Sequence, residues 1–419
     1  MSSLWVIATR CGGAGLLLIA HTIAISYFGI SDYGEVSSYV ALANILAIFG
    51  VFGSKRLIQR KIAERIGVTP SIPTGTLYTC VKACACCATV VCGLLTVFYT
   101  FTHTFTLLHW CLYIYIVLSI LIAISSGCLV GLAETFILSL NTQVLRPLVI
   151  IVVVYIFSEL EIPARAEIYF LIVVFSTFCV LVLNSLRLNN FIYYDEDSPR
   201  VRDWLLEGRM YLVVSLSLVL QNNADIFMVE QLKNSEEAGL YSYLSRISSV
   251  VLLGLAAVNI TYVRRFVRGW KVGDNKKLQA ALARGGIIAS GFALFAVVVV
   301  LLSMPLVNNT LQINGEWYGQ TVLLILLITT VISAFIGPVV MLLNMSGEQS
   351  YAARILLMCS VLNIGINIFL IPTYGALGAA VSTLISIAMW NIILAHAVYN
   401  KLGLSSGVFG IYSVYMVRD

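Results

Sequence analysis

Hydrophobic residues fill long runs of this chain, and polar residues are confined to short segments between the runs. A helix needs about 20 apolar residues to cross a bilayer core of roughly 30 Å. Runs of that kind recur from one end to the other, which predicts an all-α polytopic membrane protein with about twelve transmembrane helices. The predicted spans are 4–28, 36–53, 77–101, 107–130, 137–157, 168–188, 210–230, 238–262, 285–305, 320–343, 354–371 and 376–399.

Composition excludes most soluble classes. Of the 419 residues, 60% are hydrophobic and 11% are charged, against about 45–50% and about 25% in soluble domains. The mean hydropathy is +0.95. No large soluble domain is expected, and the net charge of +5 does not indicate a nucleic-acid partner. The first apolar run is long enough to span and no basic segment precedes it, so we expect no cleavable signal sequence.

Lysine and arginine are distributed unevenly between alternate connections. With a cytoplasmic N-terminus, nineteen of the 25 fall in inside loops, two (Arg165 and Lys233) fall in outside loops, and four lie within spans. Basic residues concentrate on the cytoplasmic side of membrane proteins. Both termini are therefore expected to be cytoplasmic, with an even number of spans.

A polar segment after the sixth span divides the chain into six helices plus six. We predict an N-terminal lobe (1–195), a cytoplasmic linker (196–209) and a C-terminal lobe (210–419). Weak similarity between 129–134 and 342–348 favours an internal repeat. Because six is even, the two bundles would share one topology, related by a pseudo-two-fold axis along the membrane normal with a central cationic cavity.

Four basic residues lie within spans: Arg10, Lys82, Arg146 and Arg246. A charge at the bilayer centre costs about 2.5–3.5 kcal/mol, so each must line an interior, pair with another group or reach the membrane surface. Lys82 lies near the end of its span, where a side chain that reaches the membrane surface explains the charge as well as a function does. Arg10 lies about two turns inside the first span, where reaching the surface is the alternative to a cavity role. Arg146, in mid-span, and Arg246, about two turns in, are better explained as cavity residues.

Two polar residues accompany these arginines. His21 follows Arg10 by eleven residues, which places both on nearly the same helical face. Gln143 lies about one turn before Arg146. We expect both polar side chains to line the same cavity as the arginines.

Other polar residues lie in the seventh and eleventh spans. Gln221, Asn222 and Asp225 form a polar stripe on the seventh span. Asp225 is either a proton or cation site that couples transport, or a salt-bridge partner of an arginine. Asn363 and Asn367, four residues apart, either hydrogen-bond sugar hydroxyls or bridge neighbouring helices.

The balance of charge within the spans predicts the chemistry of the cavity. A cationic interior suits an anionic substrate, and the arginine fork matches phosphate oxygens. The sequence contains no Walker loop, nucleophile elbow or metal-ligand cluster. We therefore expect a transporter of an anionic or anion-tagged substrate, with no cofactor, no metal and no enzymatic activity.

Three segments carry a resemblance to a known family. The chain is similar over most of its length to bacterial polysaccharide repeat-unit flippases, the O-antigen and capsule-type members of the multidrug/oligosaccharidyl-lipid/polysaccharide exporter superfamily. The residues that carry it are Phe28-Gly29, Tyr33-Gly34, Gly53 and Arg56, the segment 238–246, and the segment 374–403.

This resemblance implies a function. Such a protein would flip oligosaccharides on undecaprenyl pyrophosphate to the outer leaflet of the bacterial inner membrane by alternating access. Arg10, Arg56 and Arg246 stand where the superfamily tends to place cations that meet the pyrophosphate. Implied partners are membrane lipids and the polymerase and chain-length proteins of the pathway, with proton or sodium coupling.

Three alternatives stay open. A drug/cation antiporter of the same superfamily would prefer an acidic cavity. A membrane-embedded glycan polymerase or acyltransferase usually needs a large outer loop, and the longest one predicted here runs only from Leu306 to Gly319. A scaffold in a glycan-assembly complex is the third alternative. It would give no reason for burying arginines in the membrane, which costs free energy.

Overall fold

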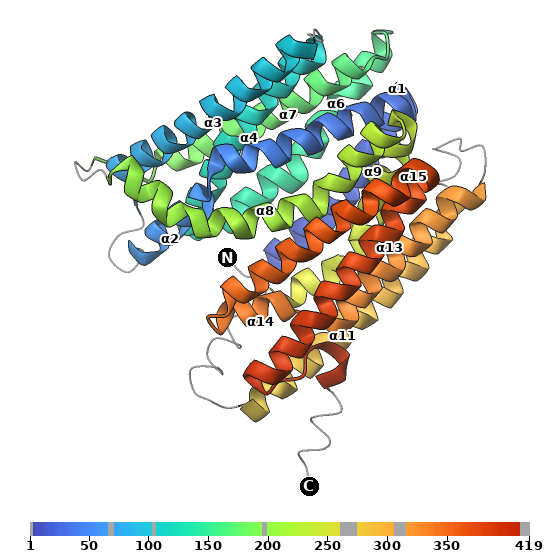
Figure 1. Cartoon of the computed structure of the whole chain (residues 1–419). Coiled ribbons are helices and arrows are strands. Elements are labelled where there is room, and N and C mark those ends of the chain that lie inside the picture. Colours follow the sequence, from blue (N-terminus) through green and yellow to red (C-terminus); the bar gives the residue numbers. More distant parts are fainter. Residues whose placement is uncertain are drawn as a thin grey trace. The chain divides into compact units, whose positions relative to one another are not determined.

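The computed structural model describes residues 3–65, 71–102, 106–194, 199–259, 275–305 and 316–410. Almost all of them lie in α-helices (Figure 1). Within this part of the chain, ten helices are long and apolar enough to cross a membrane, judged by length and composition. These helices confirm the predicted all-α polytopic fold class.

Two very long helices reconcile these ten with the twelve predicted spans. Helix α1 (Ser3–Val51) has 49 residues, and at 1.5 Å per residue it is roughly twice as long as a bilayer core is thick. It breaks at Gly29 (φ 84°, ψ 162°), between the first two predicted spans. Helix α15 (Gln349–Leu402) has 54 residues and breaks at Gly375 (φ 56°, ψ −132°), between the last two. Each helix therefore contains two predicted spans, which brings the ten described helices to twelve spans.

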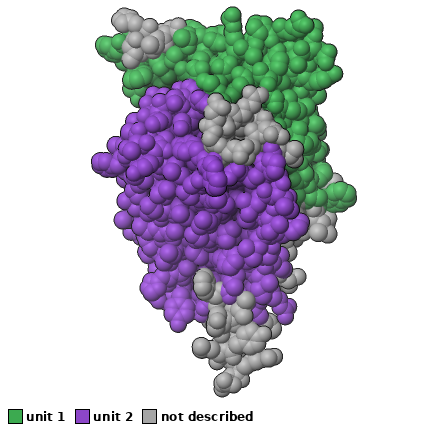
Figure 2. All heavy atoms as spheres, turned by 90° about the vertical axis from the view of Figure 1, so that its right-hand side faces the viewer, with its two compact units in different colours: residues 1–227 green, residues 228–419 purple. Residues whose placement is uncertain are grey.

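The chain forms two compact units, residues Met1–Phe227 (unit 1) and Met228–Asp419 (unit 2), coloured separately in Figure 2. The division falls within α8 (Val201–Leu232), whereas the predicted linker is 196–209. Residues 196–198 of that linker lie outside the described part. The six-plus-six division into lobes therefore stays a prediction.

Unit 1 is built around α4 (Leu107–Gly131), which packs on α1, on α7 (Ala166–Asn189) and on α2 (Ser54–Arg65). The remaining elements of unit 1 are α3 (Thr74–Thr102), α5 (Thr135–Ser139), the π-helical segment η1 (Leu140–Leu145), α6 (Arg146–Glu159) and most of α8.

A buried polar contact joins the central helices of unit 1. The Asn184 amide of α7 donates to Ser125 of α4 at 3.4 Å, and the Asn141 amide of η1 donates to the Asn184 side-chain oxygen at 2.9 Å. One span is predicted over 137–157, and the structure has a π-helical turn within it. The wider turn places Asn141 beside Asn184, so a buried hydrogen bond accompanies the departure from α geometry.

Unit 2 has a similar centre. Helix α13 (Glu316–Ile336) packs on α15, α11 (Asn275–Leu302) and α9 (Ser235–Ser249). The short helix α14 (Val339–Met345) packs on α15. Much of the predicted inside loop 263–284 and of the predicted outside loop Leu306–Gly319 lies outside the described residues.

Two predicted inside loops of unit 1 meet in a short parallel ladder. Strand β1 (Ile72–Pro73) pairs with β2 (Ile192–Tyr193), with Ile72 opposite Ile192. The Thr79 hydroxyl donates to the Pro199 carbonyl at 2.9 Å. Both loops therefore lie at one end of the unit, as the predicted topology requires of connections on one side of the membrane.

Candidate functional site

The twelve residues of α2 form an amphipathic helix within a basic stretch of sequence. Leu57, Ile58 and Ile62 are almost fully buried and lie on one face by helical spacing. Ile58 and Ile62 pack on α4 at Gly127 and Gly131, and a Cβ at Gly127 would lie 2.6 Å from the Lys55 carbonyl oxygen. The close approach to α4 fixes which face of α2 turns toward α8.

The turn between α1 and α2 packs directly against α8. Gly53 has φ 73°, a conformation that favours glycine. A Cβ there would lie 2.2 Å from the Gly208 carbonyl oxygen, so the two backbones touch. The Trp204 indole of α8, which is fully buried, donates to the Ser54 hydroxyl at 3.0 Å. These contacts fix the first turn of α2 against α8.

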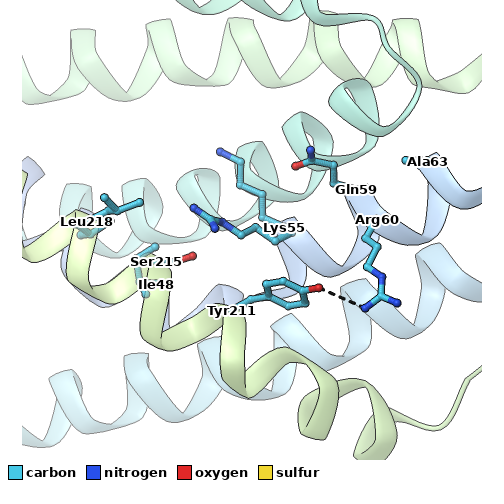
Figure 3. A pocket seen from close by; sticks show the side chains of 10 residues that line it. Ile48, Lys55, Gln59, Arg60, Ala63, Tyr211, Ser215 and Leu218 are labelled. Carbon is cyan, nitrogen blue, oxygen red and sulfur yellow. Dashed lines mark hydrogen bonds between the residues drawn. The ribbon is translucent and has the colours of Figure 1, made fainter. Parts of the chain in front are cut away.

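The other face of α2 lines a pocket within unit 1, between the end of α1, α2 and α8. Its volume is about 640 Å³. Figure 3 shows Lys55, Gln59 and Arg60 extending from α2, opposite Tyr211 and Ser215 of α8. The residues that line it are Ile48, Lys55, Arg56, Gln59, Arg60, Ala63, Tyr211, Ser215, Leu218 and Val219.

Three cations contribute to this pocket, which we call the basic pocket, and they differ in their partners. Arg60 bonds Glu64 at 2.7 Å and contacts the Tyr211 hydroxyl at 3.5 Å. Lys55 and Arg56 have no ion pair with a carboxylate among the residues that the structure describes. The basic pocket therefore contains two positive charges that its own side chains do not neutralise.

The surroundings also affect how these charges titrate. Water reaches much of the Lys55 side chain, yet desolvation by nearby protein atoms, and after it the charge of Arg56, lowers the pKa of Lys55. Desolvation likewise lowers the pKa of Arg56, against an opposing effect of Tyr211. An anion bound between them would relieve both effects, because it would bring negative charge next to partly desolvated cations.

Three solved structures are similar to this chain over most of its length. An inward-facing multidrug resistance MATE family transporter of the MOP superfamily has a TM-score of 0.64 and 13% identity, covering 100% of this chain and 99% of its own. The lipid II flippase MurJ in an inward closed conformation has 0.71 and 13%, covering 95% and 87%. A MOP superfamily transporter from Pyrococcus furiosus, described as having a binding pocket of reverse polarity, has 0.58 and 13%, covering 99% and 98%.

This chain has the fold of MOP superfamily transporters. No family model and no curated protein matches its sequence. The MOP fold, together with the ten apolar helices of the described part, supports a multi-pass membrane protein.

The predicted cations occupy different places in this MOP fold. Arg56 lines the basic pocket. Arg10 on α1 and Lys82 on α3 are exposed, and the Lys82 ammonium lies 5.7 Å from the ring centre of Tyr78. Arg10 and Lys82 do not line the basic pocket.

Arg146 begins α6 directly after the π-helical turn. Its guanidinium donates to the Tyr115 hydroxyl of α4 at 3.1 Å, and the residue is half-buried. Gln143 is also half-buried, and its backbone packs closely against α1, where a Cβ at Gly13 would lie 2.5 Å from the Gln143 carbonyl oxygen. Arg246 on α9 belongs to unit 2 and is half-buried. Contact of Arg146 and Arg246 with a substrate stays a prediction.

The polar residues of α1 and α8 are held within unit 1. His21 is buried edge-on to Tyr33, with ring centres 5.5 Å apart. Gln221 is half-buried, and the exposed Asn222 donates to the Leu218 carbonyl at 2.6 Å. Asp225 is 3% exposed on α8. Its roles as coupling site or arginine partner both stay open.

Asn363 and Asn367 bridge the two segments of α15. The Asn367 amide donates to Asn363 at 3.2 Å, and the Asn363 amide donates to Ser382 at 3.4 Å. The Ser382 hydroxyl donates in turn to Asn367. All three are buried, so the bridging interpretation accounts for their hydrogen bonds.

Sequence reasoning missed most of the basic pocket. Lys55 and Arg60 are among the nineteen basic residues of the predicted inside loops, because they lie between the predicted spans 36–53 and 77–101, and there they indicate only orientation. The positions 55, 56, 59, 60 and 63 recur at helical spacing, which was the available signal for a polar helix face. Nothing local connects that face with Tyr211, 151 residues from Arg60 along the chain.

Proposed function

We propose that the protein is a flippase that moves undecaprenyl-pyrophosphate-linked oligosaccharide repeat units across the bacterial inner membrane. The units would be of O-antigen type or of a similar polysaccharide, and would move from the cytoplasmic to the outer leaflet by alternating access. The basic pocket carries this proposal, because it presents Lys55 and Arg56 without a carboxylate partner at the end of unit 1 where predicted inside loops meet.

A diphosphate has the chemistry that this pocket lacks. Its oxygens accept hydrogen bonds from ammonium and guanidinium groups, and such charge-assisted bonds are about twice as strong as neutral ones. Gln59, Tyr211 and Ser215 supply further polar groups for oxygens or sugar hydroxyls. The lipid tail would stay in the membrane, while the charged group exchanged water for these side chains.

Similar proteins support this proposal. MurJ is a lipid II flippase, so the MOP fold accommodates a lipid-linked substrate. The Pyrococcus furiosus transporter, with its reversed pocket polarity, shows that pockets on this fold differ in charge. We extend the proposal to Arg10, Lys82, Arg146 and Arg246 as later contacts of the pyrophosphate, to cytoplasmic termini and to partnership with a polymerase and chain-length proteins.

A drug or cation antiporter is the second candidate. MATE transporters share the fold, and Asp225 is a carboxylate buried on a membrane-spanning helix. Such a carboxylate is a reasonable binding or exchange site for a cation. In that case the basic pocket would have no part in recognising the substrate.

Transport in proteoliposomes tests both candidates. The protein is reconstituted with a labelled undecaprenyl-pyrophosphate glycan, with and without a pH gradient, and exposure of the glycan on the far leaflet is measured. We expect protein-dependent exposure that Lys55→Gln combined with Arg56→Gln strongly reduces. Efflux of organic cations, with no glycan exposure while a control flippase is active, would replace the flippase by the antiporter.

A further inference from the structure

One carboxylate of unit 2 joins three elements of that unit. Glu237, in the first turn of α9, accepts the Tyr318 hydroxyl of α13 at 2.8 Å and the Ala376 backbone N–H of α15 at 2.9 Å, both on Oε2. The segments around these residues are the predicted outside connections of unit 2. A Cβ at Gly375 would lie 2.7 Å from the same carboxylate oxygen. The turn in α15 and the carboxylate therefore fit closely together.

This cluster caps the start of a helix. Ala376 and Leu377 begin the second segment of α15, so their N–H groups lack partners within the helix. Glu237 accepts the N–H of Ala376, and the Tyr318 oxygen accepts the N–H of Leu377 at 3.3 Å. A carboxylate at such a position is favoured by the partial positive charge of the helix start.

The Tyr318 hydroxyl has one proton and two acceptors. Its oxygen lies 2.8 Å from Glu237 Oε2 and 2.8 Å from the Tyr374 carbonyl oxygen. When Glu237 is ionised, the hydroxyl proton goes to the carboxylate, the stronger acceptor. When Glu237 carries a proton, the hydroxyl can donate to Tyr374 instead and accept from the carboxyl group. Both hydrogen-bond patterns fit the same heavy-atom positions.

We propose that Glu237 is a proton-binding site that couples proton entry to movement of the α15 turn. The proton would come from water on the predicted outer side and reside on the Glu237 carboxyl group. Protonation removes the negative charge from the helix cap and redirects Tyr318 to Tyr374. The Ala376 N–H then loses a charged acceptor, which weakens the connection between α9 and the turn.

Neighbouring charged and titratable groups act on this site from each packed element. On α9, Glu236 is adjacent and exposed, and Asn234 caps the helix through the Glu237 N–H at 2.8 Å. At the end of α8, the Lys233 ammonium donates to the Pro372 carbonyl in the same turn at 3.4 Å, and Glu230 lies nearby in sequence. The tyrosines named above come from α13 and α15.

The inference rests on the proposed transport function only for its coupling role, and its first test needs no substrate. Infrared difference spectra of the full chain are recorded during acid titration. We expect a carboxylic-acid carbonyl band that Glu237→Gln removes, that Glu236→Gln leaves in place, and that Tyr318→Phe shifts by removing a hydrogen bond. A spectrum unchanged by Glu237→Gln, or a band insensitive to Tyr318→Phe, overturns the proton site.

The second test measures coupling in the proteoliposomes described above. Gln resembles the protonated carboxyl group, so we expect Glu237→Gln to flip the glycan at one rate with and without the pH gradient. Glu236→Gln should keep the wild-type stimulation. Full gradient stimulation in Glu237→Gln overturns the coupling role. If no glycan is flipped by the wild type while the infrared band behaves as expected, the flippase proposal fails and the proton site stands.

Discussion

In unit 1 the Asn184 amide donates to Ser125, and in unit 2 the Asn391 amide donates to Ser333. The two pairs are separated by 59 and 58 residues along the chain. The first pair joins the central helix α4 to α7, and the second joins the central helix α13 to α15. Equivalent hydrogen bonds at nearly equal separations support the internal repeat that the sequence indicated only weakly.

A pair of salt bridges repeats in the same way. Arg187 contacts Glu134 at 2.7 Å in unit 1, and Lys401 contacts Glu348 at 2.6 Å in unit 2. Both pairs are 53 residues apart. The two glutamates end the segments 129–134 and 342–348, whose similarity the sequence analysis noted. The structure thus gives that similarity a common physical role: each glutamate holds the C-terminal end of a long helix, α7 in unit 1 and α15 in unit 2.

The units differ where chemistry is expected. In unit 1 the turn between α6 and α7 is fastened by the Tyr27 hydroxyl, which lies within hydrogen-bond distance of the Phe157 and Ile162 carbonyls. In unit 2 the turn within α15 is fastened by the Glu237 carboxylate. Unit 1 in turn carries the basic pocket. Under the two proposals above, the first copy of the scaffold would carry the anion chemistry and the second copy the proton chemistry.

The largest expected effect comes from removing the charges of Lys55 and Arg56 in the basic pocket of unit 1. Combined Lys55→Gln and Arg56→Gln should weaken binding of a diphosphate lipid by about 100-fold or more, because hydrogen bonds to charged groups contribute about 1.5–3 kcal/mol each. Isothermal titration of the detergent-solubilised protein measures this. The matched control is Lys61→Gln, since Lys61 contacts Glu207 and lies over the Trp204 ring without lining the pocket. Equal losses in both variants would remove the pocket from substrate recognition.

A smaller effect on stability should distinguish Asn184 of unit 1 from Asn391 of unit 2. Asn184→Leu leaves the buried Asn141 amide without its acceptor, and such a group costs about 1–3 kcal/mol. Asn391→Leu leaves Ser333 still bonded to the Thr329 carbonyl at 3.2 Å. In thermal unfolding in detergent, Asn184→Leu should therefore lower the free energy of unfolding by about 2 kcal/mol, and Asn391→Leu by about half of that. A larger loss for Asn391→Leu would contradict the assignment.

The repeated salt bridges should contribute less and about equally. All four side chains are between 25% and 38% exposed, and such pairs typically contribute at most about 1 kcal/mol. Glu134→Gln and Glu348→Gln should each lower the melting temperature slightly, with the difference shrinking at high salt. If one variant unfolds the protein and the other has no effect, the two pairs are not equivalent.

The smallest effect concerns pH. Desolvation and the Arg56 charge lower the pKa of Lys55, so its ammonium loses the proton earlier as pH rises. Anion affinity should therefore decline on the alkaline side in the wild type. Lys55→Arg should flatten that decline, because arginine stays charged. Binding titrations at several alkaline pH values would show it, and parallel curves for both proteins would exclude Lys55 as a contact of the anion.

Hydropathy predicted the membrane helices well because a bilayer imposes length and apolarity on each span. The breaks at Gly29 and Gly375 fall where the sequence separates spans. Helix α2 was missed because its twelve residues are too short and too charged for that signal. The pocket and the Glu237 cluster were missed because each joins residues from helices far apart in sequence.

Direct binding of two lipids tests the central claim most simply. Affinities of the purified protein for undecaprenyl pyrophosphate and for uncharged undecaprenol are compared, using wild type and the Lys55/Arg56 double variant. We expect the wild type to prefer the pyrophosphate strongly and the double variant to lose most of that preference. Equal affinity of the wild type for both lipids would contradict recognition of a lipid-linked diphosphate by the basic pocket.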